Sequence, residues 1–380
     1  MATIICFSTV DWDHLWYHPQ ALMSRFGQDG HQVIYVDTIG LRSPKLKDLR
    51  RIFLRIKNSL QTSSRDGRMT KEGVSVFSPF ILPFLNSRLA CYINVKWLVY
   101  KLNKLTKDLG SEKPIFWIYL PTWTVSECVR RIPDQLLVYN SIDALDASPD
   151  GVSRNYAIAE TEILKRADLV LTTSETLYQE KSSYNKNTHW IPSGVDESWF
   201  EPCNPASDVT DLSGPRIGFF GAIDHRLDLD LIVALAKKHE EWTFVLIGTV
   251  RCDVSILRDK KNIHFLGPKP HSELVRYVSG LDVVFLPYVL DDFTRHIQPA
   301  KLYECLAVGK PVVATRLPSL EPFDGFVYLA EGTEAFDRAL KDAIAEDKPE
   351  LQEERREVSR ANSWERRYQE ILTLVKDAMP

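Results

Sequence analysis

Short apolar runs alternate with segments of helical spacing along almost the whole chain, which leaves few folds open to it. Runs of this kind, apolar throughout, are typical of parallel strands that helices cover on both faces. We expect such strands at residues 4–8, 32–36, 115–119, 136–139, 169–172, 188–191, 216–220, 243–247, 263–266, 283–286, 311–314 and 325–328. The helices expected between them cover residues 18–26, 125–131, 157–166, 229–238, 272–277, 299–307 and 333–344.

The alternation restarts once, after residues 192–196, so the 380 residues are expected to form two domains. We predict an α/β fold with two Rossmann-like domains that face each other across a cleft. The first comprises residues 1–195 and the second residues 196–363, while the last helix, within residues 364–380, could pack on either. A loop rich in Pro, Asn, Ser and Asp, residues 201–214, is interpreted as the linker.

Open α/β sheets bind ligands at the carboxyl ends of their strands, so the strand ends of the second half are the first place to look for a site. Three of them carry a glycine, which lets backbone approach a ligand closely. The residues that we expect there are Gly221, Gly248, Gly267, Lys269 and Tyr288.

The most specific segment is residues 295–315, RHIQPAKLYECLAVGKPVVAT. It resembles the P-x-K-x-x-E-x-x-A-x-G-x-P-V-V-A-T stretch of nucleotide-sugar glycosyltransferases of the GT-B fold, particularly glycosyltransferase family 4 and bacterial exopolysaccharide glycosyltransferases. Glu160 with Asp168, and the run IPSGVD at residues 191–196, are similar to further motifs of that family in the same order. The resemblance implies a GT-B fold in which residues 364–380 cross back to the first domain.

The chemistry of this segment fits a nucleoside diphosphate. Pro299 can open a helix whose free N–H groups favour a diphosphate, and Lys301 adds a positive charge to it. Glu304 lies one turn along the same face, and the resemblance implies that its carboxylate binds the ribose hydroxyls. Without the surrounding motif, Lys301 and Glu304 would be interpreted as a solvated pair on a helix surface.

Two departures from the family pattern change what the resemblance implies. His296 stands where retaining members have a second glutamate, eight residues before Glu304, so both retaining and inverting transfer stay open. Residues 221–226, GAIDHR, replace the Arg-x-x-x-x-Lys that clamps phosphates in the family. We expect Arg226, Arg295, His296 and Lys301 to supply the compensating charge, without a metal.

An inverting transfer needs a general base in the first domain. Asp143, just after the strand at residues 136–139, is the first candidate, with turn or helix capping as the alternative. Asp11, Asp13 and His18 in the loop after the first strand are held in reserve. Trp12 and Trp16 in that loop could stack on an acceptor sugar, or could belong to the core.

Other spacings that suggest metal sites are rejected. Asp11-Trp12-Asp13 and Asp228-Leu229-Asp230 spell the D-x-D of a different glycosyltransferase fold, but the rest of the chain has the two-domain pattern. The nine histidines show no metalloprotease spacing. We interpret His225, His239, His264 and His271 as surface or strand-end residues.

Positive charge is concentrated in the first half. Residues 38–131 hold 18 Lys and Arg against 6 Asp and Glu, whereas the chain as a whole has a net charge of −4. Residues 41–60 and 89–107 predict two basic helices with interleaved apolar residues, which suits an anionic membrane surface. An ordinary solvated face is the alternative, and no nucleic-acid motif accompanies the charge. No apolar stretch is long enough to span a membrane, so we expect a cytoplasmic protein attached peripherally to the inner face.

These observations predict a metal-independent glycosyltransferase of the hexosyltransferase type, without a cofactor. It would transfer a sugar from a nucleoside diphosphate donor, UDP-linked, to a hydroxyl of a lipid-linked glycan in polysaccharide biosynthesis. A sugar-nucleotide epimerase of the same fold is one alternative, since it would need no acceptor. A catalytically silent partner subunit is the other, because the first glutamate and the phosphate clamp are missing.

Overall fold

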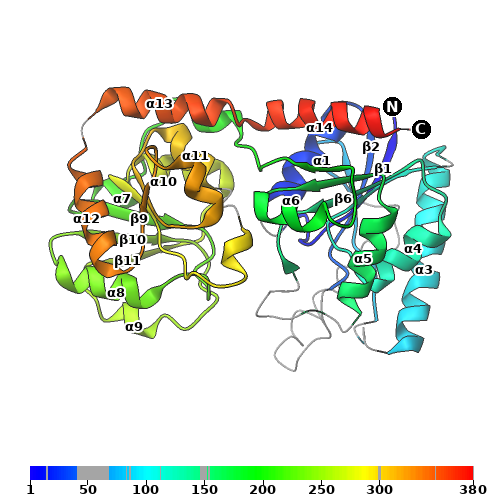
Figure 1. Ribbon diagram of the computed structural model, residues 1–380, viewed down its shortest axis with the longest axis horizontal. Coiled ribbons are helices and arrows are strands. Elements are labelled where there is room, and N and C mark those ends of the chain that lie inside the picture. Colours follow the sequence, from blue (N-terminus) through cyan, green and yellow to red (C-terminus); the bar gives the residue numbers. More distant parts are fainter. Residues whose placement is uncertain are drawn as a thin grey trace. The chain divides into compact units, whose positions relative to one another are not determined.

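The computed structural model describes residues 1–13, 16–40, 68–82, 84, 87–111, 113–145, 152, 155–297, 301–346 and 348–379. The chain divides into two compact units (Figure 1). The first comprises Met1–Ile191 with Tyr368–Pro380, and the second comprises Pro192–Arg367. Each unit is an α/β domain built on a parallel sheet, as the alternation of apolar runs predicts.

The first unit contains an eight-stranded sheet in the order β3-β4-β2-β1-β5-β6-β7-β8, parallel except for β3. Its strands are β1 Thr3–Phe7, β2 Gln32–Val36, β3 Arg68–Met69, β4 Val74–Phe77, β5 Ile115–Ile118, β6 Leu136–Ser141, β7 Leu169–Thr172 and β8 Thr188–Trp190. Its helices are α1 His18–Gln28, α3 Arg88–Asp108, α4 Trp123–Arg131, α5 Tyr156–Arg166 and α6 Glu175–Lys181. The sequence pattern did not predict β3 or β4.

The second unit contains a six-stranded parallel sheet in the order β11-β10-β9-β12-β13-β14, the classical order of a dinucleotide-binding domain. Its strands are β9 Arg216–Phe220, β10 Thr243–Ile247, β11 Ile263–Gly267, β12 Val283–Leu286, β13 Val312–Thr315 and β14 Tyr328–Ala330. The last strand was expected at residues 325–328, which was wrong: Gly325 has a φ of 99° and belongs to the turn before β14.

Helices cover both faces of the second sheet. Contacts join α8 to α9 and α12 on one side, and α11 to α10 and α13 on the other (Figure 1). Their bounds are α8 Leu229–Lys238, α9 Ser255–Arg258, α10 His271–Ser279, α11 Lys301–Val308, α12 Thr333–Ile344 and α13 Pro349–Arg360. Short helical turns lie at η3 Glu197–Phe200, η4 Thr294–His296 and η5 Pro318–Phe323.

The segment 201–214 is not a linker between the domains, because it lies inside the second unit. It contains the short helix α7, Ser207–Thr210, whose Val209 is fully buried in the core of that unit together with Ala206. Leu212 packs against the same core, so three apolar side chains hold this loop on the second unit.

The last helix, α14 Trp364–Ala378, begins in the second unit and continues into the first. Its first residue is fixed by a hydrogen bond from the Trp364 N–H to the Val195 carbonyl, 2.9 Å long. A Cβ on Gly194 would lie 2.7 Å from the Trp364 backbone, so the chain needs a glycine there. Further along, the Tyr368 hydroxyl donates to Asp29 at 2.9 Å and its ring contacts Phe26.

Candidate functional site

Loops from two neighbouring strands meet at the carboxyl edge of the second sheet. Gly221 follows β9 with a φ of 129°, and Gly248 follows β10 with a φ of 147°, both in the region that favours glycine. A Cβ on Gly248 would lie 1.8 Å from the Gly221 carbonyl oxygen. The two backbones therefore touch directly, beside the β9–β12 pair where the strand order reverses.

Lys301, the first residue of α11, points its ammonium group to this edge. Its Nζ donates to the Tyr288 hydroxyl at 3.2 Å, and a Cβ on Gly221 would lie 2.7 Å from it. The ammonium also lies 5.0 Å from the ring centre of Phe219 and 5.9 Å from that of Phe220. Ring faces attract a cation electrostatically, so these aromatic side chains help to hold the ammonium group at this edge.

Glu304, one turn further along α11, is held by a histidine. His271 Nε2 lies 3.0 Å from Glu304 Oε1, and the two side chains are 28% and 17% exposed. Burial lowers the pKa of His271, but the hydrogen bond to Glu304 and the charges of Glu304 and Asp196 outweigh it, so the pKa lies above its usual value. Trp199 packs against the imidazole, with the ring centres 6.1 Å apart.

His271, interpreted from the sequence as a surface or strand-end residue, begins α10 shortly after β11 and is the partner of the candidate ribose ligand. His239 was misjudged: it is buried, stacks on Trp242 at 3.7 Å and bonds to Asp337 at 2.5 Å. No sequence motif marks the contact of His271 with Glu304, since 33 residues separate the two.

The remaining predicted donor residues have other partners in the structure. Arg226 forms a two-pronged ion pair with Asp224 at 2.8 and 2.7 Å. Lys269 pairs with Asp208 at 3.0 Å and lies 4.6 Å above the Tyr277 ring. Of the predicted donor residues, the contacts given above join Gly221, Gly248, Tyr288 and Lys301 at one edge of the sheet, with Glu304 on the same helix as Lys301.

The contacts described above do not join three further residues of the predicted donor set to that group: Arg295, His296 and Gly267. In η4, His296 Nδ1 contacts the Asp292 carbonyl at 2.5 Å and the side chain of Arg295 is exposed. Gly267 ends β11 with a φ of 69° and has open space around it. Pro299 lies outside the described residues, and α11 is described from Lys301 onward.

In the first unit, the loops after β1 and β2 clamp each other. Asp37 accepts the Trp12 N–H at 2.9 Å, and Asp11 accepts the Thr38 N–H at 3.1 Å. The Ser78 hydroxyl after β4 donates to the other oxygen of Asp37. Burial raises the pKa of Asp37 to about 6, within reach of neutral pH. The sequence did not single out Asp37, although a polar residue directly after an apolar strand is the available signal.

The reserve base His18 is buried and neutral. Its Nδ1 lies 3.1 Å from the Tyr119 hydroxyl, which also accepts from Asn140 at 3.3 Å. Burial lowers the pKa of His18 to about 3. The structure thus places His18 in a polar chain with two residues at the ends of β5 and β6, neither of which the sequence pattern had marked.

The other first-unit candidates differ in their burial and in their contacts. Asp143 follows β6 and is half-buried. Asp13 is exposed and forms an ion pair with Arg68 at 2.7 Å. Trp12 belongs to the core, since it is 9% exposed and its ring meets Tyr35 edge-on at 4.9 Å, whereas Trp16 is half-buried.

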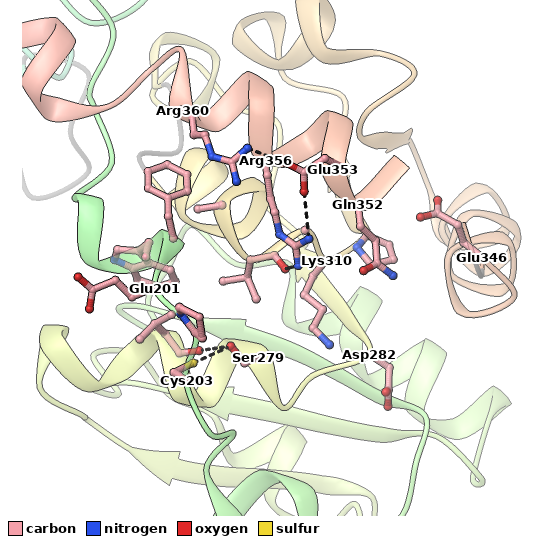
Figure 2. A pocket seen from close by; sticks show the side chains of 18 of the residues that line it. Glu201, Cys203, Ser279, Asp282, Lys310, Glu346, Gln352, Glu353, Arg356 and Arg360 are labelled. Atoms are coloured by element: carbon pink, nitrogen blue, oxygen red, sulfur yellow. Dashed lines mark hydrogen bonds and ion pairs between the residues drawn. The ribbon is translucent and has the colours of Figure 1, made fainter. Parts of the chain in front are cut away.

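A separate cavity of about 630 Å³ lies at the far end of α11 (Figure 2). It is lined by residues that precede β12 and β13, including Asp282 and Lys310, so it lies at the amino edge of the second sheet. Arg356 and Arg360 of α13 share Glu353 there, at 3.4 and 2.7 Å. Among the described residues, no cluster of three or more His, Cys, Asp or Glu side chains could hold a metal ion.

Residues 214–346, which contain all the strands of the second sheet, match the family model for glycosyl transferases group 1. The chain contains a glycosyl transferases group 1 domain. This domain contains the candidate site residues Gly221, Gly248, Tyr288, Lys301 and Glu304.

The chain is also 30% identical over 230 residues to TuaH of Bacillus subtilis (strain 168), a protein that bears the name of a teichuronic acid biosynthesis glycosyltransferase. The match covers 56% of this chain and 58% of TuaH, so the two correspond over little more than half their lengths.

Solved structures similar to the whole chain share the GT-B fold. Sucrose-phosphate synthase from Thermosynechococcus elongatus has a TM-score of 0.71 at 16% identity, with 99% of both chains covered. Anabaena HepE, solved in complex with UDP and glucose, has a TM-score of 0.66 at 15% identity, again with 99% of both chains covered. The two-domain α/β fold predicted from the sequence is therefore confirmed as GT-B.

Proposed function

We propose that the protein is a glycosyltransferase that moves a hexose from a UDP-linked donor to a hydroxyl of a lipid-linked glycan in polysaccharide biosynthesis. The observation that carries the proposal is the placement of Lys301 beside Gly221, with Glu304 one turn along the same helix. The glycosyl transferases group 1 domain and the relationship to TuaH support it. A UDP donor is supported by the similarity to HepE, which was solved with UDP and glucose.

In this mechanism the acceptor oxygen attacks the anomeric carbon, the bond from that carbon to the diphosphate oxygen breaks, and UDP leaves with the electron pair. Negative charge builds up on the diphosphate, and a fixed cation beside it lowers the barrier. Lys301 supplies this charge, with its position set by Tyr288 and the Phe219 ring. We propose that this cation acts in place of a metal, and that Glu304 binds the ribose hydroxyls.

Asp143 is the proposed base that takes the proton of the acceptor hydroxyl. Its place just after the carboxyl end of β6 supports the proposal, because ligands of open α/β sheets bind at that edge. The reserve candidate His18, with a pKa of about 3, is a weak base. A base in the first unit belongs to an inverting reaction, so the anomeric configuration of the product tests this assignment.

A lipid-linked acceptor places the enzyme at a membrane, and we propose peripheral attachment to the anionic inner face through the basic region 41–107. Of this region, residues 41–67 lie outside the described part of the chain, whereas α3 is described. Among the described residues, no helix combines the length and the apolar composition that a membrane crossing requires.

The test is an assay of UDP release from UDP-hexoses, with and without a lipid extract that contains glycan acceptors. The proposed transferase releases UDP only when acceptor is present. An epimerase would interconvert the donor sugar without acceptor and release no UDP. A silent partner subunit would neither release UDP nor bind it in calorimetry, and that outcome would contradict the proposal.

A further inference from the structure

Helix α3 exposes large apolar side chains to solvent. The exposed fraction is 69% for Leu89, 49% for Tyr92, 45% for Ile93 and 65% for Tyr100. Their spacing of three, four and seven residues places all four on one face of the helix. Such a stripe on a surface helix marks an interaction site, since apolar residues on a solvated face normally occur singly.

The opposite face of α3 packs against the core of the first unit. Val95, Leu98, Leu102 and Leu105 belong to the buried core of the first unit. The helix therefore has two apolar faces, and its exposed one is not a consequence of loose packing. The exposed stripe extends over the 19 residues from Leu89 to Lys107, about 27 Å of helix.

The charges on the exposed stripe are all positive. Lys96, Lys104 and Lys107 are exposed and continue the spacing of the apolar residues. Lys96 lies 4.8 Å above the Tyr92 ring, so cationic and apolar groups are interleaved. Asp108 is the one acidic residue between 88 and 108, and it lies beside Lys104 at the last turn of the helix.

The segment before α3 adds two more apolar side chains. Asn94 accepts the Leu82 N–H at 2.8 Å and donates to the Leu82 carbonyl at 3.0 Å, which ties this segment to the helix. Phe80 and Phe84 on either side of that tie are 42% and 64% exposed. Six of the sixteen large exposed apolar residues described in the chain thus fall between residues 80 and 100.

We propose that the α3 face, defined as Leu89, Tyr92, Ile93, Lys96, Tyr100, Lys104 and Lys107, docks on an anionic lipid bilayer with the helix in the plane of the interface. Apolar side chains enter the acyl boundary while lysines contact lipid phosphates. A second copy of the chain is a poor occupant, because the face as defined holds three lysines and no carboxylate, so a contact with itself supplies no anion to them. The inference rests on the proposed function, in which the acceptor is lipid-linked.

The test is flotation of the full chain with vesicles of phosphatidylglycerol, compared with vesicles of phosphatidylcholine. One variant removes the apolar part (Leu89→Ser, Ile93→Ser, Tyr100→Ser) and another the charge (Lys96→Gln, Lys104→Gln, Lys107→Gln). The matched controls change exposed residues elsewhere: Ile158→Ser, Tyr184→Ser and Ile256→Ser, and Lys186→Gln, Lys237→Gln and Lys261→Gln.

Wild type and both controls should float with phosphatidylglycerol and not with phosphatidylcholine. Each lysine contributes about fivefold to binding, so the charge variant should bind about 100-fold more weakly. The apolar variant should also lose flotation. Equal flotation of both α3 variants and wild type would overturn the proposal, as would a dimer in sedimentation velocity that the apolar variant abolishes and that binds no vesicles.

Calorimetry with UDP on the same proteins separates this inference from the proposed function. UDP affinity unchanged in both α3 variants, together with lost flotation, supports the α3 face as a lipid surface. If wild type floated but bound no UDP, the proposed function would be contradicted, whereas the inference that the α3 face binds lipid would still be supported.

Discussion

The Nε2 atom of His271 lies 3.0 Å from Oε1 of Glu304, so a titratable side chain holds the proposed ribose ligand in the free protein. The pKa of His271 is raised in the folded state, chiefly because its bond to Glu304 outweighs burial. Stability from this pair is therefore fully present below the unfolded pKa of histidine and is lost as the pH rises through the folded pKa.

We expect His271→Gln to remove this pH dependence. At about pH 6 the variant should be about 1 kcal/mol less stable than wild type, and at about pH 8 the difference should shrink. Urea unfolding followed by tryptophan fluorescence at the two pH values measures it. A difference that grows toward high pH would contradict the assigned pairing.

Gly248→Ala tests the contact between the two glycine loops. Its Cβ would lie 1.8 Å from the Gly221 carbonyl oxygen, at a φ of 147°, so the loops must separate. We expect a loss of about 2 kcal/mol or more in unfolding free energy, and weaker UDP binding. The matched control is Gly267→Ala, where φ is 69° and nothing lies within 4 Å, so the loss should be about 1 kcal/mol. Equal losses in the two variants would argue against the close approach.

Asp37 gives the first unit an acid-side pH dependence. Burial raises its pKa from 3.8 to about 6, so the folded state holds the proton more tightly than the unfolded state. Its contribution to stability therefore grows as the pH falls from about 6 to about 4, by about 2 kcal/mol. Comparing wild type with Asp37→Asn in urea at both pH values isolates this contribution. If the unfolding free energies of the two proteins change equally between the two pH values, Asp37 makes no such contribution and the prediction is contradicted.

Arg355 and Glu346 form a buried ion pair in the second unit. Their side chains are 1% and 3% exposed, and the guanidinium contacts both carboxylate oxygens at 2.5 and 2.8 Å. Arg355→Met leaves the carboxylate without its cation and should destabilise the protein by about 3 to 5 kcal/mol. Adding Glu346→Gln should restore part of that loss. Thermal unfolding of both variants checks whether the double variant is the more stable of the two. A double variant less stable than Arg355→Met would contradict the prediction.

The alternation of strands and helices was predictable because parallel strands buried on both faces are apolar at every position. β9, β10 and β12 match the predicted bounds, and α8 and α12 match as well. The sequence pattern does not predict helix α13, since its buried residues are Arg355 and Ser359 rather than apolar residues. The sequence pattern did not predict β4, because Val74–Phe77 is short and contains a serine.

For the candidate site, sequence reasoning reached Lys301 and Glu304 through a motif but not their neighbours. The contacts of Glu304 with His271 and of Trp12 with Asp37 join residues that are far apart in the chain. Such contacts depend on which strand ends become neighbours, and local spacing carries no record of strand order. The ion pair of Lys269 with Asp208 was missed for the same reason, because 61 residues separate the two. Arg226 pairs with Asp224 only two residues away, but no motif marks that pair.

The most direct test of the central claim is isothermal titration calorimetry of UDP with wild type, Glu304→Ala and the control Glu273→Ala, an exposed glutamate on α10. If Glu304 binds the ribose, its loss removes a charge-assisted hydrogen bond of about 1 to 3 kcal/mol, which weakens UDP binding by about 5- to 150-fold, while Glu273→Ala binds like wild type. Equal UDP affinity in all three proteins would contradict the claim that this edge of the sheet holds the nucleotide.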